Sequence, residues 1–567
     1  MNQTRTFLIF AWLMVATLLW MAWGKEKATP SPPVTTSATS AAASTVPSVT
    51  GANVPNVPKL PTAATMSATP DAATTDSAHA PTVTVTTDVL RVTLDGGAIH
   101  SADLLRYPQS TEPGSAPMRL FADDPAHFFQ AQSGWVSSTG AAPSHEAGFV
   151  PESPQQNFSL AAGSNTLTVP FVWHGANGVT IRRTYSFIRG DYAVNVRDDV
   201  VNAGSAPWQG YIYRQLLRVP PQVQSGMTHP ESYSFHGAAW FSPQDKFDKR
   251  KFGKYDDGGT LDKAVTGGWI AMLQHHFFAA WIPGANDAST FSLASPQGSG
   301  GQQALIRELG PGVTVAAGAS ASTQARLWVG PKLVKQIESQ QVPGLERAVD
   351  FSSYSVMAWL AGLLFAVLSF LHGLFGNWGW SIIGLVVLIK LAMYPLSAAQ
   401  YKSGAKMRRF QPRIEQLKER YGDDKQKFQM AMMELYKKEK INPVGGCLPV
   451  LVQMPVFLAL YWTLLESVEL RQASWIGWIH NLTAPDPYFI LPVINIAVMW
   501  ATQKLTPSPG MDPMQKKMMQ IMPLAMGVMF AFFPAGLVLY WVTNGSLGLL
   551  QQWWMTKRHG QPLPAKA

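Results

Sequence analysis

Lys390 stands out because it lies near the end of a long stretch without formal charge. After Asp350 no Asp, Glu, Lys or Arg occurs before Lys390, and the next polar segment begins directly after Leu396. A cation inside a bilayer costs roughly 2.5–3.5 kcal/mol on insertion scales. Two interpretations remain open: Lys390 reaches the headgroups from near a helix end, or it is a functional cation in a water-filled cavity.

Motifs of the common enzyme classes are absent from the sequence. There is no HExxH, GxSxG, Walker loop or CxxC. His275 and His276 are adjacent on a predicted strand, so they should point to opposite faces and make a poor metal site. The single cysteine, Cys447, excludes a disulfide scaffold and is most simply a small buried hydrophobe. We therefore predict no metal, no cofactor and no covalent catalysis.

Two predicted membrane spans are short. Residues 487–503 and 518–533 would form helices of about 24–26 Å, less than the roughly 30 Å hydrocarbon core. Such helices thin the bilayer or do not fully cross it. The second span carries a methionine stripe, which either packs or offers an adaptable surface for apolar ligands; the stripe comprises Met519, Met522, Met526 and Met529.

Polar side chains recur inside the other predicted spans. Each could simply hydrogen-bond a neighbouring helix, whereas together with Lys390 they favour a wetted interior. These residues are Gln453, Thr463, Asn495, Thr502, Thr543 and Asn544.

A strongly basic segment lies between Gln400 and Ile441, with 12 Lys and Arg against 6 Asp and Glu. Its apolar residues recur at helical spacing, which predicts a hairpin with arms at 401–421 and 425–440. The arms either pack on each other with charges that only solvate them, or they form a docking surface for RNA, lipid headgroups or a protein.

Composition and strand patterning indicate the fold class that holds these residues in place. The 567-residue chain is 47% hydrophobic and only 14% charged, with a net charge of +9, against about 25% charged in typical proteins. This disfavours an ordinary cytosolic enzyme, and the apolar content excludes wholesale disorder. Residues 82–333 contain many short period-two strands separated by Gly, Pro and Asn turns, which predicts a large antiparallel β-sandwich with its own core.

The amino-terminal region predicts an anchor and a tether. Residues 1–24 have a basic flank at Arg5 and an apolar run that ends in Trp20 and Trp23. A cleavable signal peptide is the alternative, but we favour a retained membrane anchor with a cytoplasmic N-terminus. Residues 25–81 are rich in Ala, Thr, Ser and Pro, and this composition predicts a disordered linker.

The charges of the loops predict the membrane topology. Positive loops stay in the cytoplasm, so the hairpin at 400–441 should be inside and the sandwich outside. Only one crossing can then separate them, so 334–376 becomes a connecting helix plus an interfacial helix. Residues 377–556 supply five spans, and 557–567 form a basic cytoplasmic tail. Six transmembrane spans result, with both termini cytoplasmic.

Several motifs of the membrane half resemble the YidC family of bacterial membrane-protein insertases. They recur in the family's order, and the resemblance covers essentially the whole chain. The motifs are MYPLSAAQY at 393–401, NPVGGCLP at 442–449, QMPVFLAL at 453–460, VELRQ at 468–472, DPM at 512–514 and FPAGLVLY at 533–540.

The resemblance implies a bacterial inner-membrane protein with a periplasmic sandwich of galactose-mutarotase type and a hydrophilic groove among five helices. Lys390 matches the groove cation, a position at which many members have Arg. Lysine keeps the positive charge but lacks the paired N–H donors with which a guanidinium binds a carboxylate. The expected groove and slide contacts are Gln453, Met454, Phe457, Met526, Met529, Tyr540, Trp541 and Asn544. The residues expected to dock ribosomes or nascent chains are Lys402, Lys406, Arg408, Arg409, Arg413, Lys557 and Arg558.

The predicted function is therefore a membrane-protein insertase and chaperone without covalent chemistry. The implied partners are nascent membrane proteins, the Sec translocon with its accessory subunits, the ribosome and membrane lipids, but not DNA. One alternative is a membrane-anchored periplasmic carbohydrate-active enzyme that uses the sandwich. Another is a solute transporter, which would usually show inverted repeats and charges in several spans.

Overall fold

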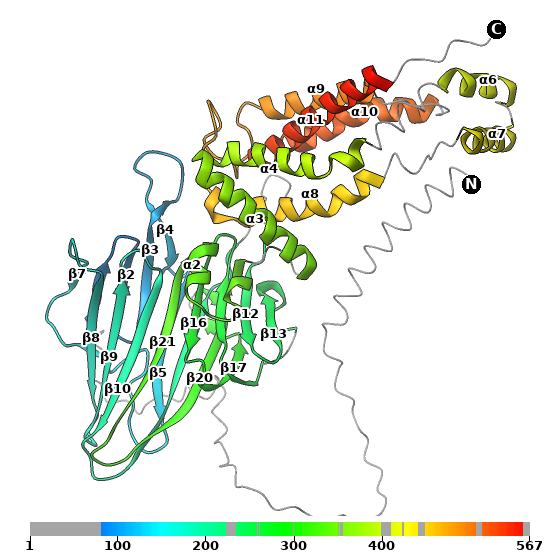
Figure 1. Ribbon diagram of the computed structural model, residues 1–567. Helices are drawn as coiled ribbons and strands as arrows, with labels where there is room; N and C mark the ends of the chain where they lie inside the picture. The colour runs from blue at the N-terminus through cyan, green and yellow to red at the C-terminus, as the bar shows by residue number, and fades with distance from the viewer. Residues whose placement is uncertain are drawn as a thin grey trace, which may run out of the picture.

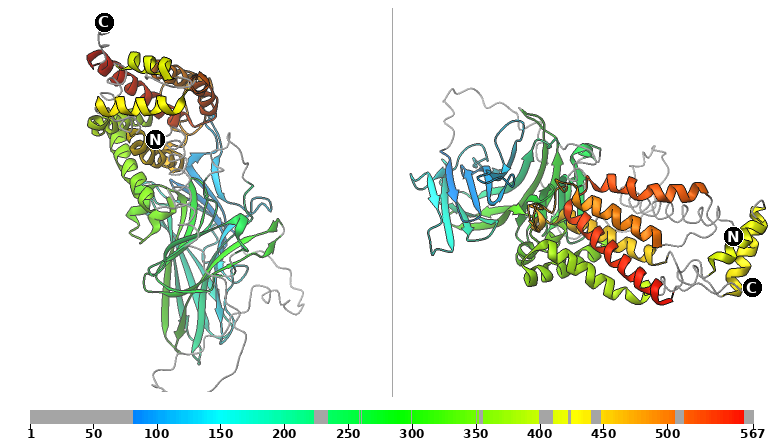
Figure 2. Two further views of the ribbon diagram at one scale, coloured as in Figure 1. Left: turned by 90° about the vertical axis from the view of Figure 1, so that its right-hand side faces the viewer. Right: turned by 90° about the horizontal axis from the view of Figure 1, so that it is seen from above.

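The computed structural model describes residues 81–222, 234–257, 259, 261–298, 300–349, 351, 355–398, 410–421, 424–439, 448–505 and 513–559. The predicted anchor (1–24) and almost all of the linker lie outside these residues. Figure 1 shows a β-sandwich joined to a bundle of helices, and Figure 2 shows a separate helix pair at the end of the bundle away from the sandwich.

Two large sheets form the sandwich in the described residues. The ten-stranded sheet has the order β14-β17-β20-β11-β5-β3-β2-β1-β7, with β4 paired to β3. Its strands are β1 (Val83–Thr86), β2 (Leu90–Leu94), β3 (Ala98–Pro108), β4 (Pro117–Phe121), β5 (Phe129–Ser137), β7 (Asn157–Ser159), β11 (Trp208–Arg218), β14 (Lys263–Thr266), β17 (Ala288–Ala294) and β20 (Ala304–Val315).

The nine-stranded sheet has the order β13-β12-β15-β16-β21-β10-β9-β8-β6. Its strands are β6 (Val150–Pro151), β8 (Thr166–His174), β9 (Val179–Ile188), β10 (Ala193–Asn202), β12 (Gly237–Ser242), β13 (Lys246–Lys251), β15 (Trp269–Leu273), β16 (Phe277–Pro283) and β21 (Ser320–Pro331). A small pair, β18 (Gln297–Gly298) and β19 (Gly301–Gln302), stands apart.

The strands follow the alternation seen in the sequence. In β9 every second residue from Val179 to Phe187 is buried, because side chains of a strand alternate between its faces. The chain then turns at Gly190, whose φ of 74° suits glycine, and returns as β10. The sandwich prediction is confirmed, except that β1 pairs with β7 in parallel.

The prediction that His275 and His276 lie on a strand and point apart is wrong. Both lie in the tight turn between β15 and β16, where Gln274 N donates to the Phe277 carbonyl. Their rings stack with centroids 3.7 Å apart. The two-residue turn breaks the strand alternation on which the prediction relied.

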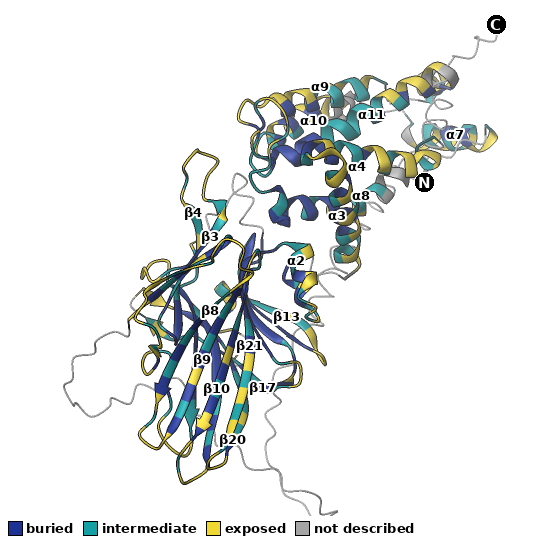
Figure 3. Ribbon diagram, turned by 60° about the vertical axis from the view of Figure 1, so that its left-hand side comes forward, coloured by how far each residue is buried: buried dark blue, intermediate teal, exposed yellow. Residues whose placement is uncertain are grey.

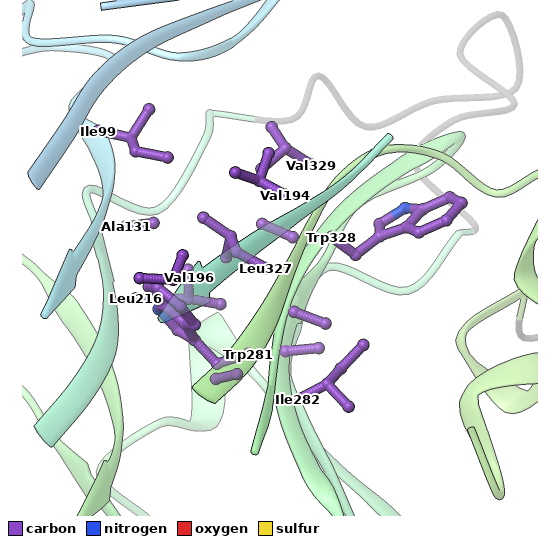
Figure 4. Packing of buried hydrophobic residues seen from close by; sticks show 14 of the residues in the cluster. Ile99, Ala131, Val194, Val196, Leu216, Trp281, Ile282, Leu327, Trp328 and Val329 are labelled. Atoms are coloured by element: carbon purple, nitrogen blue, oxygen red, sulfur yellow. The ribbon is translucent and has the colours of Figure 1, made fainter. Parts of the chain in front are cut away.

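Apolar side chains from both sheets fill the space between them (Figure 4), and Figure 3 shows the buried residues along the strands in dark blue. Figure 4 shows Trp281, Leu327 and Val196 among the packed residues. Ion pairs are also buried in the sandwich: Arg183 donates to both carboxylate oxygens of Asp198 at 2.7 Å, and Arg214 donates to Glu308 Oε2 at 3.0 Å. The folded domain is strongly destabilised if one partner of such a pair is removed, because the other charge stays buried.

The described part of the second region is mainly helical. Its helices are α2 (Val334–Ser339), α3 (Ser355–Phe375), α4 (Trp378–Ala392), α6 (Gln411–Tyr421), α7 (Lys425–Lys438), α8 (Leu448–Glu466), α9 (Ile490–Leu505), α10 (Pro513–Phe530) and α11 (Ala535–His559). Two 3₁₀ turns, η4 (Leu345–Val349) and η6 (Val468–Leu470), lie beside them, and η3 (Phe252–Lys254) lies in the sandwich.

Two sequence features explain how these helices begin and end. Asn377 caps α4, because its side-chain oxygen accepts from the backbone N–H groups of Gly379 and Trp380. The predicted turn around Pro534 lies between α10 and α11, as expected. Within the described residues, one stretch, Val356–Phe375 in α3, is both long and apolar enough to cross a membrane, with a mean hydropathy of 2.0.

Candidate functional site

A polar contact joins α8 and α11 inside the bundle. Gln453 Nε2 donates to Asn544 Oδ1 at 3.0 Å, and both side chains are half-buried. The two residues are 91 positions apart, so only the fold brings them together. By contrast, Thr502 bonds a carbonyl of its own helix, and Thr463 bonds the carbonyls of Ala459 and of Ala361 in α3.

A cluster of aromatic rings lies one helical turn from this polar pair. Phe457 lies one turn from Gln453 on α8, and its ring centroid is 4.9 Å from that of Trp541 and 6.2 Å from that of Tyr540. Phe530 at the end of α10 also contacts Trp541. Trp541 Nε1 is buried without a hydrogen-bond partner in the part of the chain that is described. The site therefore combines apolar surface with unused polar capacity.

The predicted methionine contacts divide into two groups. Met526 and Met529 are half-buried and pack against the same helical cluster as Phe457 and Tyr540. Met454 on α8 is 46% exposed, and Met522 on α10 is 49% exposed. The stripe is thus partly packing and partly open surface.

Lys390 lies in the last turn of α4, a helix that packs against α3 and α11. Its side chain is half-buried, and no carboxylate pairs with it among the described residues. Burial of an unpaired cation is unfavourable in an apolar medium. No hydrogen bond or ion pair in the described chain joins Lys390 to Gln453 or Asn544.

Only some of the predicted docking residues can be placed. Arg413 on α6 pairs with Glu439 at 3.1 Å, and Phe410, Ile414, Met432 and Tyr436 pack between α6 and α7. The hairpin prediction holds for the described parts of both arms. Lys557 lies on α11 with its Nζ 5.4 Å from the Trp553 ring centroid. The side chains of Lys402, Lys406, Arg408, Arg409 and Arg558 lie outside the described residues.

A second polar cluster, which no sequence pattern indicated, lies where the C-terminal end of α8 meets the sandwich. Glu466 at the end of α8 lies 3.8 Å from Lys332 Nζ, and both side chains are almost fully buried. Ser234 Oγ donates to Glu466 Oε1 at 2.8 Å. His275 Nε2 donates to the Leu465 carbonyl at 2.8 Å, and burial lowers the pKa of His275 to about 3, so its ring is neutral.

The turn after α8 continues this contact. Val468 is buried in the hydrophobic core of the sandwich. Glu469 accepts a hydrogen bond from the backbone N–H of Val334 at the start of α2, and burial raises the pKa of its carboxyl to about 7. Arg471 Nη2 donates to the Gln109 carbonyl at 3.3 Å, and Gln472 Nε2 donates to the Pro108 carbonyl at 3.1 Å.

Comparison with known proteins gives two family matches that together span most of the chain. A family model described as "60Kd inner membrane protein" matches residues 370–561, and one described as "YidC periplasmic domain" matches residues 82–367. A relative from Stenotrophomonas maltophilia (strain K279a), named "Membrane protein insertase YidC", is 60% identical over 100% of this chain and 98% of its own. A relative of the same name from Xanthomonas axonopodis pv. citri (strain 306) is 58% identical over 99% and 98%.

Two solved structures that match this chain have much lower sequence identity to it. A crystal structure of an active YidC insertase with its first transmembrane domain resolved covers 83% of this chain and 94% of its own, at 18% identity and a TM-score of 0.37. A galactose mutarotase related enzyme from Lactobacillus acidophilus covers 44% of this chain and 97% of its own, at 8% identity and a TM-score of 0.31.

Proposed function

Because the chain belongs to the YidC family of membrane protein insertases, we propose that α4, α8 and α11 form the path along which a substrate segment enters the membrane. The chain is an insertase and not an enzyme, so the carbohydrate-active alternative is set aside. The observation that carries the proposal is the Gln453–Asn544 hydrogen bond next to a cluster of aromatic side chains on the same two helices.

This arrangement suits a segment with both polar and apolar parts. Transfer of a polar group from water into hydrocarbon without a hydrogen bond costs several kcal/mol of free energy. Gln453 and Asn544 can exchange their mutual hydrogen bond for bonds to a passing backbone. Phe457 and Met529, which are half-buried, offer apolar contacts to the part of the segment that stays in the membrane. Tyr540, expected as a further contact, is buried in the helical core and packs behind Phe457. Release into lipid then follows from partition of that apolar part.

Lys390 supplies the charge in this proposal. An acidic residue of the substrate would gain much more from a cation in a partly buried site than in bulk water, because the effective dielectric constant is lower. A lysine attracts a carboxylate as a point charge and needs no fixed bidentate geometry. We therefore infer that Lys390 favours substrates with acidic tails.

The proposed topology has six spans, the sandwich in the periplasm, and both termini and the α6–α7 hairpin in the cytoplasm. Its support is the position of the hairpin, at the end of the bundle away from the sandwich (Figures 1 and 2). The proposed interfacial helix is α3, which buries Ala361, Leu364 and Leu368 against the bundle and exposes Trp359 and Phe370.

Nascent membrane proteins are the substrates. The Sec translocon, the ribosome and membrane lipids are proposed as further partners. The basic hairpin supports a cytoplasmic docking role, because its outward charges can attract a polyanionic surface at long range. Arg413 pairs with Glu439 and is thereby partly neutralised, so the contribution of the hairpin is expected to come from its other cations.

Charge reversal of Lys390 tests the proposed path. Full-length chain with Lys390→Glu is reconstituted in proteoliposomes, and insertion is followed for two single-span substrates whose translocated tails differ only in Asp against Asn. The variant should block the Asp tail and spare most insertion of the Asn tail. The matched control is Lys504→Glu, which reverses another lysine near a helix end. Equal insertion of both tails by the Lys390 variant would refute the role of the cation.

A further inference from the structure

We propose that Arg471 forms a second, outer anion site that receives the carboxylate of a translocated segment after it has passed α8 and α11. The inference deepens the proposed function and rests on it. It starts from a cavity of about 210 Å³ between the bundle and the sandwich. Its walls include Arg471, Asn481 and Thr483 from the loop after α8, His275 from the sandwich, and Leu464 and Pro534 at the outer ends of the helices.

The cavity lies in line with the proposed path. Leu464 follows Gln453 by 11 residues on α8, which is about 16 Å along a helix. Pro534 directly precedes α11, the helix that carries Asn544. A chain that moves outward between α8 and α11 would therefore leave them at this cavity.

Arg471 is available to bind an anion. Its guanidinium makes one hydrogen bond, to the Gln109 carbonyl at 3.3 Å, and lies 5.6 Å from the Phe277 ring centroid. In the described part of the chain no carboxylate pairs with it. A guanidinium has five N–H donors, so most of its capacity is left for a ligand.

The three acidic residues of the surrounding loop do not neutralise Arg471, because each is engaged elsewhere. Glu466 lies beside Lys332 and accepts from Ser234. Glu469 accepts from the start of α2, and its raised pKa weakens its charge near neutral pH. Asp486 accepts from Trp478 Nε1 and from the backbone N–H groups of Tyr488 and Leu491.

The rest of the wall suits a carboxylate. Asn481 Oδ1 already accepts from Gln472 N, Thr483 N and Thr483 Oγ1, so its amide N–H groups are the part that can serve a ligand. The neutral ring of His275 adds no competing charge. The cavity volume matches a side chain rather than a lipid headgroup with its acyl chains. The occupant is therefore an Asp or Glu side chain of the passing segment.

The experiment uses the full-length chain in proteoliposomes and substrates whose translocated tails carry two Asp, two Asn or two Lys. The main variant is Asn481→Asp, which keeps the three accepted hydrogen bonds and places a carboxylate beside Arg471. It should slow insertion of the Asp tail about fivefold or more and change the Asn tail less than about twofold. Arg471→Gln should also slow the Asp tail selectively, and Arg471→Lys should recover part of the rate.

The outcomes separate the possible explanations. Equal slowing of Asp and Asn tails by Asn481→Asp would mean a structural role only and would overturn the site. An effect that follows the fraction of anionic phospholipid in the vesicles, and not the tail charge, would assign the cavity to a lipid phosphate and also overturn it. If Lys390→Glu discriminates the tails and Asn481→Asp does not, the outer site fails while the proposed function stands. If neither variant discriminates them, both fail.

Discussion

The buried pair of Lys332 and Glu466 gives a sharp prediction about how the sandwich is fixed to the bundle. Lys332→Met removes the cation and leaves the Glu466 carboxylate buried, since the two side chains are 0% and 2% exposed. Removal of one partner of a buried pair costs about 3–5 kcal/mol. The contact between the sandwich and α8 should then open about a hundredfold more often or more.

Hydrogen exchange of the full-length chain measures this opening. The amides to follow are those of Ser467 and Leu470, which bond the carbonyls of Thr463 and Ser467 beside the junction. The double variant Lys332→Met/Glu466→Gln should regain much of the protection, because both partners are then neutral and Gln keeps an oxygen for the Ser234 hydroxyl.

Lys335→Met is the matched control, because Lys335 is exposed and lies only three residues further along the chain. It should change exchange at the junction little. The reasoning would be refuted if Lys332→Met and Lys335→Met had the same effect, or if the double variant simply added the losses of its two single variants.

Three further predictions concern other parts of the molecule. Asp198→Asn should destabilise the sandwich by about 3–5 kcal/mol, visible as a lower unfolding midpoint, because Arg183 stays buried with its charge. Gln453→Leu should lower the stability of the helix bundle in detergent by about 1–2 kcal/mol, because the hydrogen bond to Asn544 is lost. Gln453→Asn should lower it less, because it keeps an amide donor. Burial raises the pKa of the Glu469 carboxyl to about 7 from an ordinary 4.5. Between these pH values the carboxyl is protonated while η6 is packed on the sandwich, and it loses the proton when this contact opens. The contact between η6 and the sandwich should therefore weaken as pH rises from about 4.5 to 7. Amide hydrogen exchange at the junction, measured across that pH range, should show this weakening in the unmodified chain and not in Glu469→Gln.

Local patterns were sufficient to predict the sandwich. The alternation from Val179 to Phe187 and the turn at Gly190 together specify a β-hairpin, because each side chain has a definite face and glycine permits the left-handed turn. The turn at Pro534 was predicted equally well, since proline cannot continue a helix. These features depend on neighbours in the sequence.

The junction could not be predicted, because it depends on residues far apart in the sequence. Ser234 and Glu466 are 232 positions apart, and His275 and Leu465 are 190 apart. Each of these residues has an ordinary role in its own segment: a loop serine, a helix-end acid or a turn histidine. Only the position of the bundle on the sandwich turns them into one cluster. The expectation for His275 failed for the related reason that a two-residue turn leaves little trace in hydrophobic periodicity.

The contact between His275 and the Leu465 carbonyl also has a consequence for the order in which the protein is made. The sandwich ends at Pro331, and α8 begins at Leu448, so on the order of ten seconds of synthesis separate the two. Small two-state β-sandwiches fold in milliseconds to seconds, and larger ones pass through intermediates. We therefore expect the surface that contacts the end of α8 to form before that helix is made. The first domain to be synthesised thus serves as the template on which a later helix of the same chain finds its depth and rotation.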